Sequence, residues 1–267
     1  MIRRFATVLA IGFVASLSGI FALPALAQEP TAAIIPNLIA PNHDGAQISV
    51  TVTRGLTSNK SLRTSALRRA RDAMHKGEHV AADDLRSLAQ AGDGLAAQRY
   101  VRLLLARDEA ANPSDIAYFS AVAVGTGRVW TLRNMVKAMH QLDPKTEPKE
   151  RITKYIQVLY PHAWAGNTLA LEAVTAFNGN GQLFGPLSEK TRLRILEQSR
   201  KNGDGRIELG MAMSLLERSR AASTPNPDDL AQARSLLEQA SASGHLAVST
   251  SAQNLLRLID KDKTDDT

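Results

Sequence analysis

His75, Glu78 and His79 stand at the spacing H-x-x-E-H, the inverted zinc-protease motif. That chemistry needs both imidazoles on one face of a rigid helical turn, together with a third metal ligand further along the chain. Gly77 lies inside the motif, at the point where the sequence predicts the end of a helix. The two imidazoles would then not be held together, so we predict a polar turn between helices and no zinc site.

Two Gly-Asp-Gly stretches, residues 92–94 and 203–205, have the composition of calcium- or phosphate-binding loops. A calcium loop needs several oxygen ligands at alternating positions and usually a closing glutamate, and neither stretch supplies them. A helix stop followed by an aspartate N-cap accounts for both. The acid pairs at 83–84 and 228–229 stand at helix starts, where the helix dipole favours them. We therefore predict no catalytic residue, no metal and no cofactor.

Aromatic and basic side chains form the remaining candidate for a functional site. Most aromatic residues of a domain pack in its core. Those that stay exposed beside arginines would suit a protein or glycan partner. The candidate partner-binding residues are Arg99, Arg102, Arg128, Trp130, Arg133, Lys137, Tyr160 and Trp164.

Five glycines, spaced 35, 39, 37 and 41 residues apart, divide the chain into similar units. Small or apolar residues recur at four-residue steps around most of them, as in two amphipathic helices joined by a tight turn. A period in the thirties to low forties is typical of a helical-repeat solenoid. We predict an all-α fold, a right-handed superhelical solenoid of helix–turn–helix repeats with about eleven helices. The repeat-turn glycines are Gly92, Gly127, Gly166, Gly203 and Gly244.

The first 27 residues have the pattern of a signal peptide. Arg3 and Arg4 precede an apolar run, and residues 25–27 read Ala-Leu-Ala, a signal peptidase site. This predicts cleavage after Ala27 and a periplasmic or secreted protein. An uncleaved membrane anchor is the alternative, because the apolar run approaches a span of about 20 residues.

Residues 28–58 are predicted to be a flexible linker or N-terminal arm, because prolines at 30, 36 and 41 break any helix. Residues 47–53 alternate and are rich in β-branched side chains, so a short strand is possible there. This segment either stays disordered until something binds it or packs along the superhelix, and we favour disorder. The repeat domain is predicted over residues 59–262, and a disordered tail over residues 263–267.

Charge and cysteine content narrow the classes of partner. The 267 residues carry a net charge of +6, which falls to +4 without the leader because the leader holds two arginines and no acid. This weak, scattered charge does not favour a nucleic-acid partner. The chain has no cysteine, which excludes disulfides, thiol catalysis, thiolate metal sites and lipid attachment after a signal peptide. Its stability must come from a hydrophobic core.

Residues 88–93, followed by Ala96, and residues 237–245 resemble the Sel-one-like repeat, a relative of the tetratricopeptide repeat. In that family a helix ends in Ala-x-x-Gly, and the next helix carries small and apolar residues at fixed steps. Residues 177–181 are similar to its glycine-rich loop between repeats. The resemblance covers roughly residues 80–258. The family's Leu-Gly pair, expected eight and nine residues after the glycine, is missing in every copy.

The resemblance implies an exported protein–protein interaction module, a regulator or scaffold in envelope or exopolysaccharide signalling or secretion. Size and soluble export suit periplasmic regulators of the ExoR type, which hold a membrane sensor kinase in check. Scaffolds of the AlgK type are lipid-anchored, so the missing cysteine counts against them. The expected partner is a membrane sensor kinase or a secretion-complex subunit. Two alternatives remain: a polysaccharide- or peptidoglycan-binding accessory of an envelope enzyme complex, and a structural oligomer joined through an apolar face of the helix at 246–259.

Overall fold

The computed structural model describes residues 45–107, 112–222 and 226–265. In these residues the chain forms eleven α-helices, three short 3-10 helices and no strand, which confirms the all-α fold and the number of helices expected. No described helix is both long enough and apolar enough to span a bilayer. The predicted leader, residues 1–27, lies outside the described residues. The helices are α1 (Ser65–His75), α2 (Ala82–Gln90), α3 (Gly94–Arg107), α4 (Pro113–Gly125), α5 (Leu132–Met139), α6 (Lys149–Trp164), α7 (Thr168–Phe177), α8 (Glu189–Asn202), α9 (Arg206–Ala221), α10 (Pro227–Ser241) and α11 (Leu246–Asp265).

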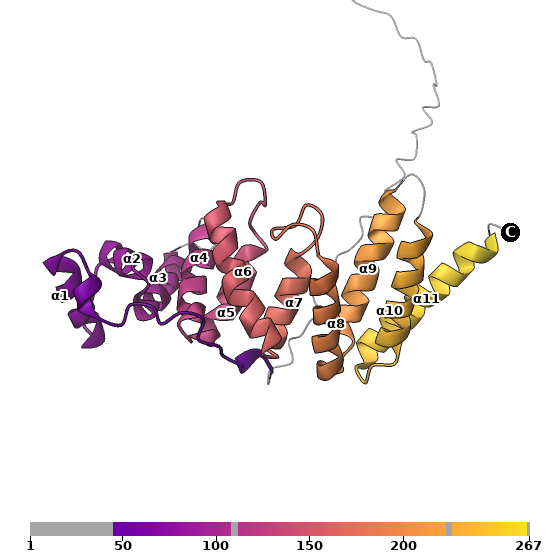
Figure 1. Ribbon diagram of the computed structural model, residues 1–267, viewed down its shortest axis with the longest axis horizontal. Helices are drawn as coiled ribbons and strands as arrows, with labels where there is room; N and C mark the ends of the chain where they lie inside the picture. Colours follow the sequence, from indigo (N-terminus) through magenta and orange to yellow (C-terminus); the bar gives the residue numbers. More distant parts are fainter. Residues whose placement is uncertain (1–44, 108–111, 223–225, 266–267) are drawn as a thin grey trace, which may run out of the picture. The chain divides into compact units, whose positions relative to one another are not determined.

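Most successive helices pack against one another along the chain, but α6 packs on α4 and α7 and not on α5 (Figure 1). Alternate helices also contact one another, and these contacts define two layers of helices. α2, α4 and α6 belong to one layer, and α5, α7, α9 and α11 belong to the other. Fully buried side chains such as Phe119, Met135, Tyr155 and Leu159 fill the core. Their burial at helical spacing is the amphipathic pattern that the sequence predicts.

Left-handed glycines close the turns between paired helices. The φ angles of Gly92, Gly127 and Gly166 are 90°, 95° and 98°, and that of Gly203 is 70°. Such a conformation favours glycine and lets the last carbonyls of a helix receive hydrogen bonds. Gly244 also lies in a turn, between α10 and α11, but it does not have a positive φ.

A polar residue after the glycine caps the next helix in two of these turns, and at a third it bonds to the first N–H of the helix. Asp93 Oδ1 accepts the backbone N–H groups of Leu95 and Ala96, both at 3.0 Å. Asn167 Oδ1 accepts from the N–H of Ala170, and Asp204 Oδ1 from that of Arg206. The interpretation as a helix stop and an aspartate cap is therefore confirmed for residues 92–94. In residues 203–205 the glycine stop is confirmed, but the N-cap of α9 is Gly205 and not Asp204.

The H-x-x-E-H motif does not lie on one helical turn. α1 ends at His75, and Gly77 follows with a φ of 85°. Glu78 and His79 therefore stand beyond the helix, as the glycine predicts. Within the described residues, no group of three or more His, Asp or Glu side chains is placed to hold a metal ion.

A buried polar network holds the connection between α5 and α6. Glu147 is 8% exposed, and its Oε1 accepts hydrogen bonds from the Tyr155 hydroxyl at 2.7 Å and from Ser114 Oγ at 3.0 Å. Arg151 donates to Ser114 Oγ and to Asp115, so the network joins the starts of α4 and α6. Burial and the nearby Glu147 carboxylate raise the pKa of the Tyr155 hydroxyl well above its usual range, so it remains a donor.

The C-terminal helix corrects one predicted boundary. α11 continues to Asp265, three residues into the tail that we predicted to be disordered, because no glycine or proline interrupts it. Leu246 and Leu258 of this helix are 81% and 50% exposed. Twelve residues separate them, which places them about 120° apart around the helix. They do not form the apolar stripe that the oligomer hypothesis requires.

We expect the substitution Glu147→Ala to lower the free energy of unfolding by about 2 kcal/mol, because the buried Tyr155 hydroxyl loses its 2.7 Å acceptor and keeps only the Ser114 carbonyl at 3.4 Å. Urea unfolding followed by circular dichroism measures the change. Glu150→Ala is the matched control, since Glu150 is an exposed carboxylate three residues further along, and we expect a change within about 0.5 kcal/mol. Equal effects of the two substitutions would contradict the role given to Glu147.

Candidate partner-binding surfaces

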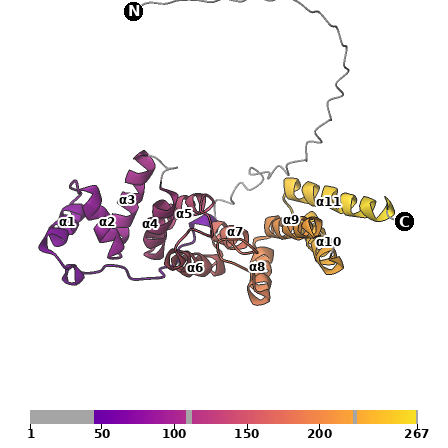
Figure 2. The same cartoon turned by 90° about the horizontal axis from the view of Figure 1, so that it is seen from above.

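The described part of the predicted arm, residues 45–58, is here called the arm segment. It begins with the 3-10 helix η1 (Gly45–Gln47) and then runs without regular structure to η2 (Asn59–Ser61). Figure 2 shows it as a single extended chain between α1 and the region of α6 and α7. Of the two alternatives for this part of the chain, packing against the helices is the one observed, and the disorder that we favoured is wrong for residues 46–56. The strand considered for residues 47–53 is also absent from the arm segment.

Backbone groups of the arm segment bind the turns of two repeats. The N–H groups of Val52 and Thr53 donate to the carbonyl of Gly125, at 2.8 and 2.9 Å. The N–H of Leu56 donates to the carbonyl of Gly92 at 3.0 Å. Gly125 is the last residue of α4, whose terminal carbonyls have no partner within the helix, and Gly92 stands in the turn just past the end of α2. The arm segment therefore supplies the donors that these ends lack.

At the third turn, two buried side chains hold the arm segment. His162 accepts the N–H of Val50 through Nε2 at 3.1 Å, and its Nδ1 lies 2.8 Å from the Val158 carbonyl. The carbonyl can only accept, so Nδ1 carries the proton and the imidazole is neutral. The Asn167 amide donates to the carbonyls of Ala46 and Ile48, each at 2.8 Å. Both side chains are fully buried.

The C-terminal end of the arm segment is fixed by Arg71. Its guanidinium donates to Asp93 at 2.7 Å, to Asn59 at 2.8 Å and to the Leu56 carbonyl at 2.9 Å. Gly55 precedes this anchor with a φ of 64°, and a Cβ on it would lie 2.6 Å from the Gly92 carbonyl oxygen. Only glycine allows this close approach, so the chain bends at Gly55 between an anchored end and a stretch held mainly by main-chain bonds.

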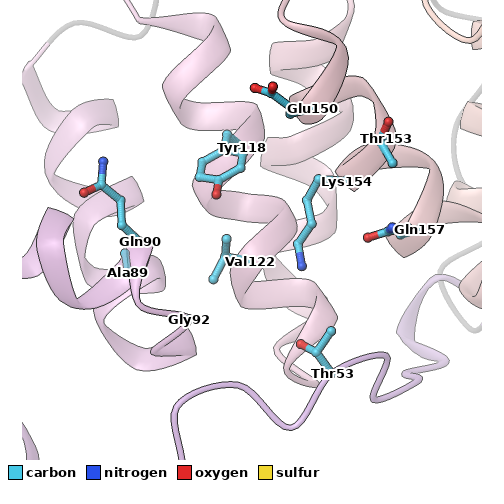
Figure 3. A pocket seen from close by; sticks show the side chains of 10 residues that line it. All are labelled: Thr53, Ala89, Gln90, Gly92, Tyr118, Val122, Glu150, Thr153, Lys154 and Gln157. Carbon is cyan, nitrogen blue, oxygen red and sulfur yellow. The ribbon is translucent and has the colours of Figure 1, made fainter. Parts of the chain in front are cut away.

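A cavity of about 370 Å³ opens beside the arm segment. Within the described residues, the side chains of Gln90, Glu150, Lys154 and Gln157 have no hydrogen-bond or ion-pair partner. Burial lowers the pKa of the Lys154 ammonium. The cavity therefore offers polar groups that an added side chain could bind. Its lining comes from α2 and the turn after it, α4, α6 and the arm segment: Thr53, Ala89, Gln90, Gly92, Tyr118, Val122, Glu150, Thr153, Lys154 and Gln157 (Figure 3).

Two of the predicted partner-binding residues meet on the α3–α5 side. Trp130 is 62% exposed, the largest exposed aromatic side chain among the described residues. With the Gln98 amide oriented to accept, its oxygen receives the Trp130 indole N–H at 2.9 Å and Arg102 Nη2 at 2.8 Å. Gln98 itself is 7% exposed. A buried amide thus fixes an exposed tryptophan beside an arginine.

The other predicted residues do not all join this surface. Arg133 and Lys137 are exposed and follow Trp130 at helical spacing. Arg128 bends back to donate to Thr126, and Arg99 approaches the Glu78 carbonyl at 3.5 Å. Tyr160 and Trp164 are partly buried on α6: they pack edge to face at 5.4 Å, and the Arg194 guanidinium covers the Trp164 ring at 4.5 Å. Tyr160 and Trp164 thus pack against each other and against Arg194 of α8.

A second polar cluster joins α7 to α9. The Arg206 guanidinium lies 3.7 Å from Glu172 and from Asp204. Burial raises the pKa of the Glu172 carboxyl to about 7, against the lowering effect of Arg206. The cluster combines two carboxylates with one guanidinium at the Gly203 turn, where it ties the two helices together.

Comparisons of the chain with known protein families, with characterised proteins and with solved structures find no match. The resemblance to Sel-one-like repeats therefore stays a prediction from the residues alone.

Sequence reasoning missed the arm segment, His162 and Asn167 as parts of a binding surface. One signal was present in the spacing of Ile48, Val52 and Leu56, which are apolar residues four apart. Ile48 lies at the Gly166 turn, Val52 at the end of α4 and Leu56 at the Gly92 turn. Four extended residues of the arm segment therefore span the distance from one repeat turn to the next. His162 stands in the last turn of α6 before Gly166, and Asn167 directly follows this glycine; both side chains are buried at the turn.

We expect the arm segment to loosen as the pH falls below 6.5, the ordinary pKa of histidine. Burial lowers the pKa of His162, so the folded state favours the neutral ring. Its contribution is full above 6.5 and is lost as the pH falls through the lowered pKa. A protonated Nε2 could no longer accept the Val50 N–H. Hydrogen exchange of the Val50 and Val52 amides, corrected for intrinsic rates, measures the effect.

The control for this prediction is His162→Gln, which keeps a polar side chain at the site but cannot titrate. Burial lowers the pKa of His140 as well, so a global pH effect would persist in this variant. Loss of amide protection that is the same in both proteins would refute the role of His162.

Proposed function

We propose that this chain is an exported protein–protein interaction module, a periplasmic regulator or scaffold in envelope or exopolysaccharide signalling or secretion. Its partner in this proposal is a membrane sensor kinase or a secretion-complex subunit. We also propose that the eleven helices form a right-handed superhelical solenoid of Sel-one-like repeats. Helix pairing, alternate-helix contacts and left-handed repeat glycines support this arrangement.

The observation that carries the proposal is Trp130. Tryptophan and arginine dominate the binding energy of protein interfaces, and a side chain fixed before binding loses less entropy on association. Trp130 and Arg102 share the buried Gln98 amide, so both are oriented in the absence of a partner. Exposed Arg133 adds positive charge nearby, which favours a partner with acidic side chains at this contact.

The test is capture from an envelope extract with the full chain and with the Trp130→Ala variant, followed by mass spectrometry. We expect one membrane or secretion protein to be enriched by the native chain and lost with the variant. Retention on isolated envelope polysaccharide that depends on Trp130, with no protein captured, would favour the polysaccharide alternative. Identical captures by the two proteins would contradict the proposed surface.

For the partner so identified, we expect Trp130→Ala to weaken binding at least about thirtyfold, as for an interface hot spot. Gln98→Met should cost about threefold to tenfold, because it keeps Trp130 but removes its fixed orientation. Leu193→Ala is the control, since Leu193 is another large apolar side chain and is 56% exposed. Isothermal titration calorimetry gives the three affinities. An equal loss for Leu193→Ala would place the contact elsewhere.

A further inference from the structure

We propose that the turns under the arm segment form a binding track for extended polypeptide, and that a partner's segment can replace the arm segment there. The track consists of Gly125, Gly127, His162 and Asn167. The occupant is an extended segment with an apolar residue at every fourth position. The inference rests on the proposed function and specifies how the partner is held.

The track binds mainly main-chain atoms. The Gly125 carbonyl takes two backbone N–H groups, His162 takes a third, and the Asn167 amide gives both its protons to backbone carbonyls. One side-chain bond is present, from Ser49 Oγ to the Gly127 carbonyl at 3.2 Å. Any extended chain offers the same backbone groups, so this main-chain part of the binding does not depend on the arm segment's sequence.

The arm segment is held with little side-chain burial. Ile48 remains 38% exposed, and Val52 and Leu56 are only partly buried. Ser49, Thr51, Thr53 and Arg54 are exposed, and Val50 is half-buried. Release therefore exposes little apolar surface, whereas the buried groups of His162 and Asn167 would lose their partners. The buried groups of the track therefore require an extended backbone as their partner, and another extended segment could supply it.

The cavity beside Thr53 gives a partner an advantage over the arm segment. Threonine is short, and the polar groups of Lys154 and Gln157 remain without partners across about 370 Å³. A longer polar side chain at this place would reach groups that the arm segment leaves unused. Gly55 and the Arg71 anchor allow residues 46–54 to leave while residues 56–61 stay in place.

The experiment measures binding in trans of a labelled peptide with the sequence of residues 45–58. The full chain is compared with its Ile48→Asp/Val52→Asp variant, which weakens the arm segment and leaves the track unchanged. A tethered arm competes at an effective concentration in the millimolar range. We expect the peptide to bind the variant at least about tenfold more tightly than the native chain.

Gln47→Asp/Thr57→Asp is the matched control, because it adds the same charge at exposed positions of the arm segment. The peptide should bind this control as weakly as it binds the native chain. A peptide carrying Thr53→Gln should bind the Ile48→Asp/Val52→Asp variant about fivefold more tightly than the unmodified peptide, through the cavity. Circular dichroism and sedimentation verify that each variant is folded and give its oligomeric state.

Absence of peptide binding to the folded variant, or equal binding to all three proteins, would overturn the track. If the native chain forms dimers that dissociate when the peptide is added, the track binds a second copy of this chain, and the proposal of a separate partner is refuted. These outcomes are independent of the envelope capture. Peptide binding without a captured protein would refute only the proposed function. Capture of a protein without peptide binding would refute only the track.

Discussion

The ends of the helices impose the constraint on which this structure depends. Each α-helix leaves N–H groups at its start and carbonyls at its end without partners inside the helix. In a chain of short helices these ends recur every few turns. Gly92, Gly127 and Gly166 satisfy part of the need by their left-handed conformation. Asp93 and Asn167 satisfy another part by capping the next helix. The arm segment bonds to the carbonyls of Gly92 and Gly125.

Because one turn serves several purposes, stability and recognition share residues. Asn167 caps α7 through its amide oxygen and binds the arm segment through its amide nitrogen. Asp93 caps α3 with one carboxylate oxygen and binds Arg71 with the other. A substitution at either residue disturbs a helix start and the arm segment together. Changes in the arm segment itself are the ones that separate the two roles.

Local features of the fold could be predicted from the sequence because their causes are local. Each helix is marked by a glycine stop, an aspartate cap or apolar residues at steps of four. These signals act within one or two helical turns, so the sequence predicts the helices. The contact of the arm segment could not be predicted with the same ease. Main-chain hydrogen bonds leave no side-chain signature, and His162 lies 112 residues from Val50. Spacing suggested a groove lined by Trp130 and Trp164 alike, but Arg194 of a later helix covers Trp164.

The position of Gln98 argues that the Trp130 surface serves more than packing. Burying an amide is costly unless its hydrogen bonds are made, and an apolar side chain of similar volume would avoid that cost. Gln98 directs its oxygen to two side chains at the surface, and Trp130 stays 62% exposed. The core gains little from that arrangement. What it secures is the orientation of a tryptophan and an arginine toward solvent, and a fixed orientation reduces the entropy lost when such side chains bind a partner.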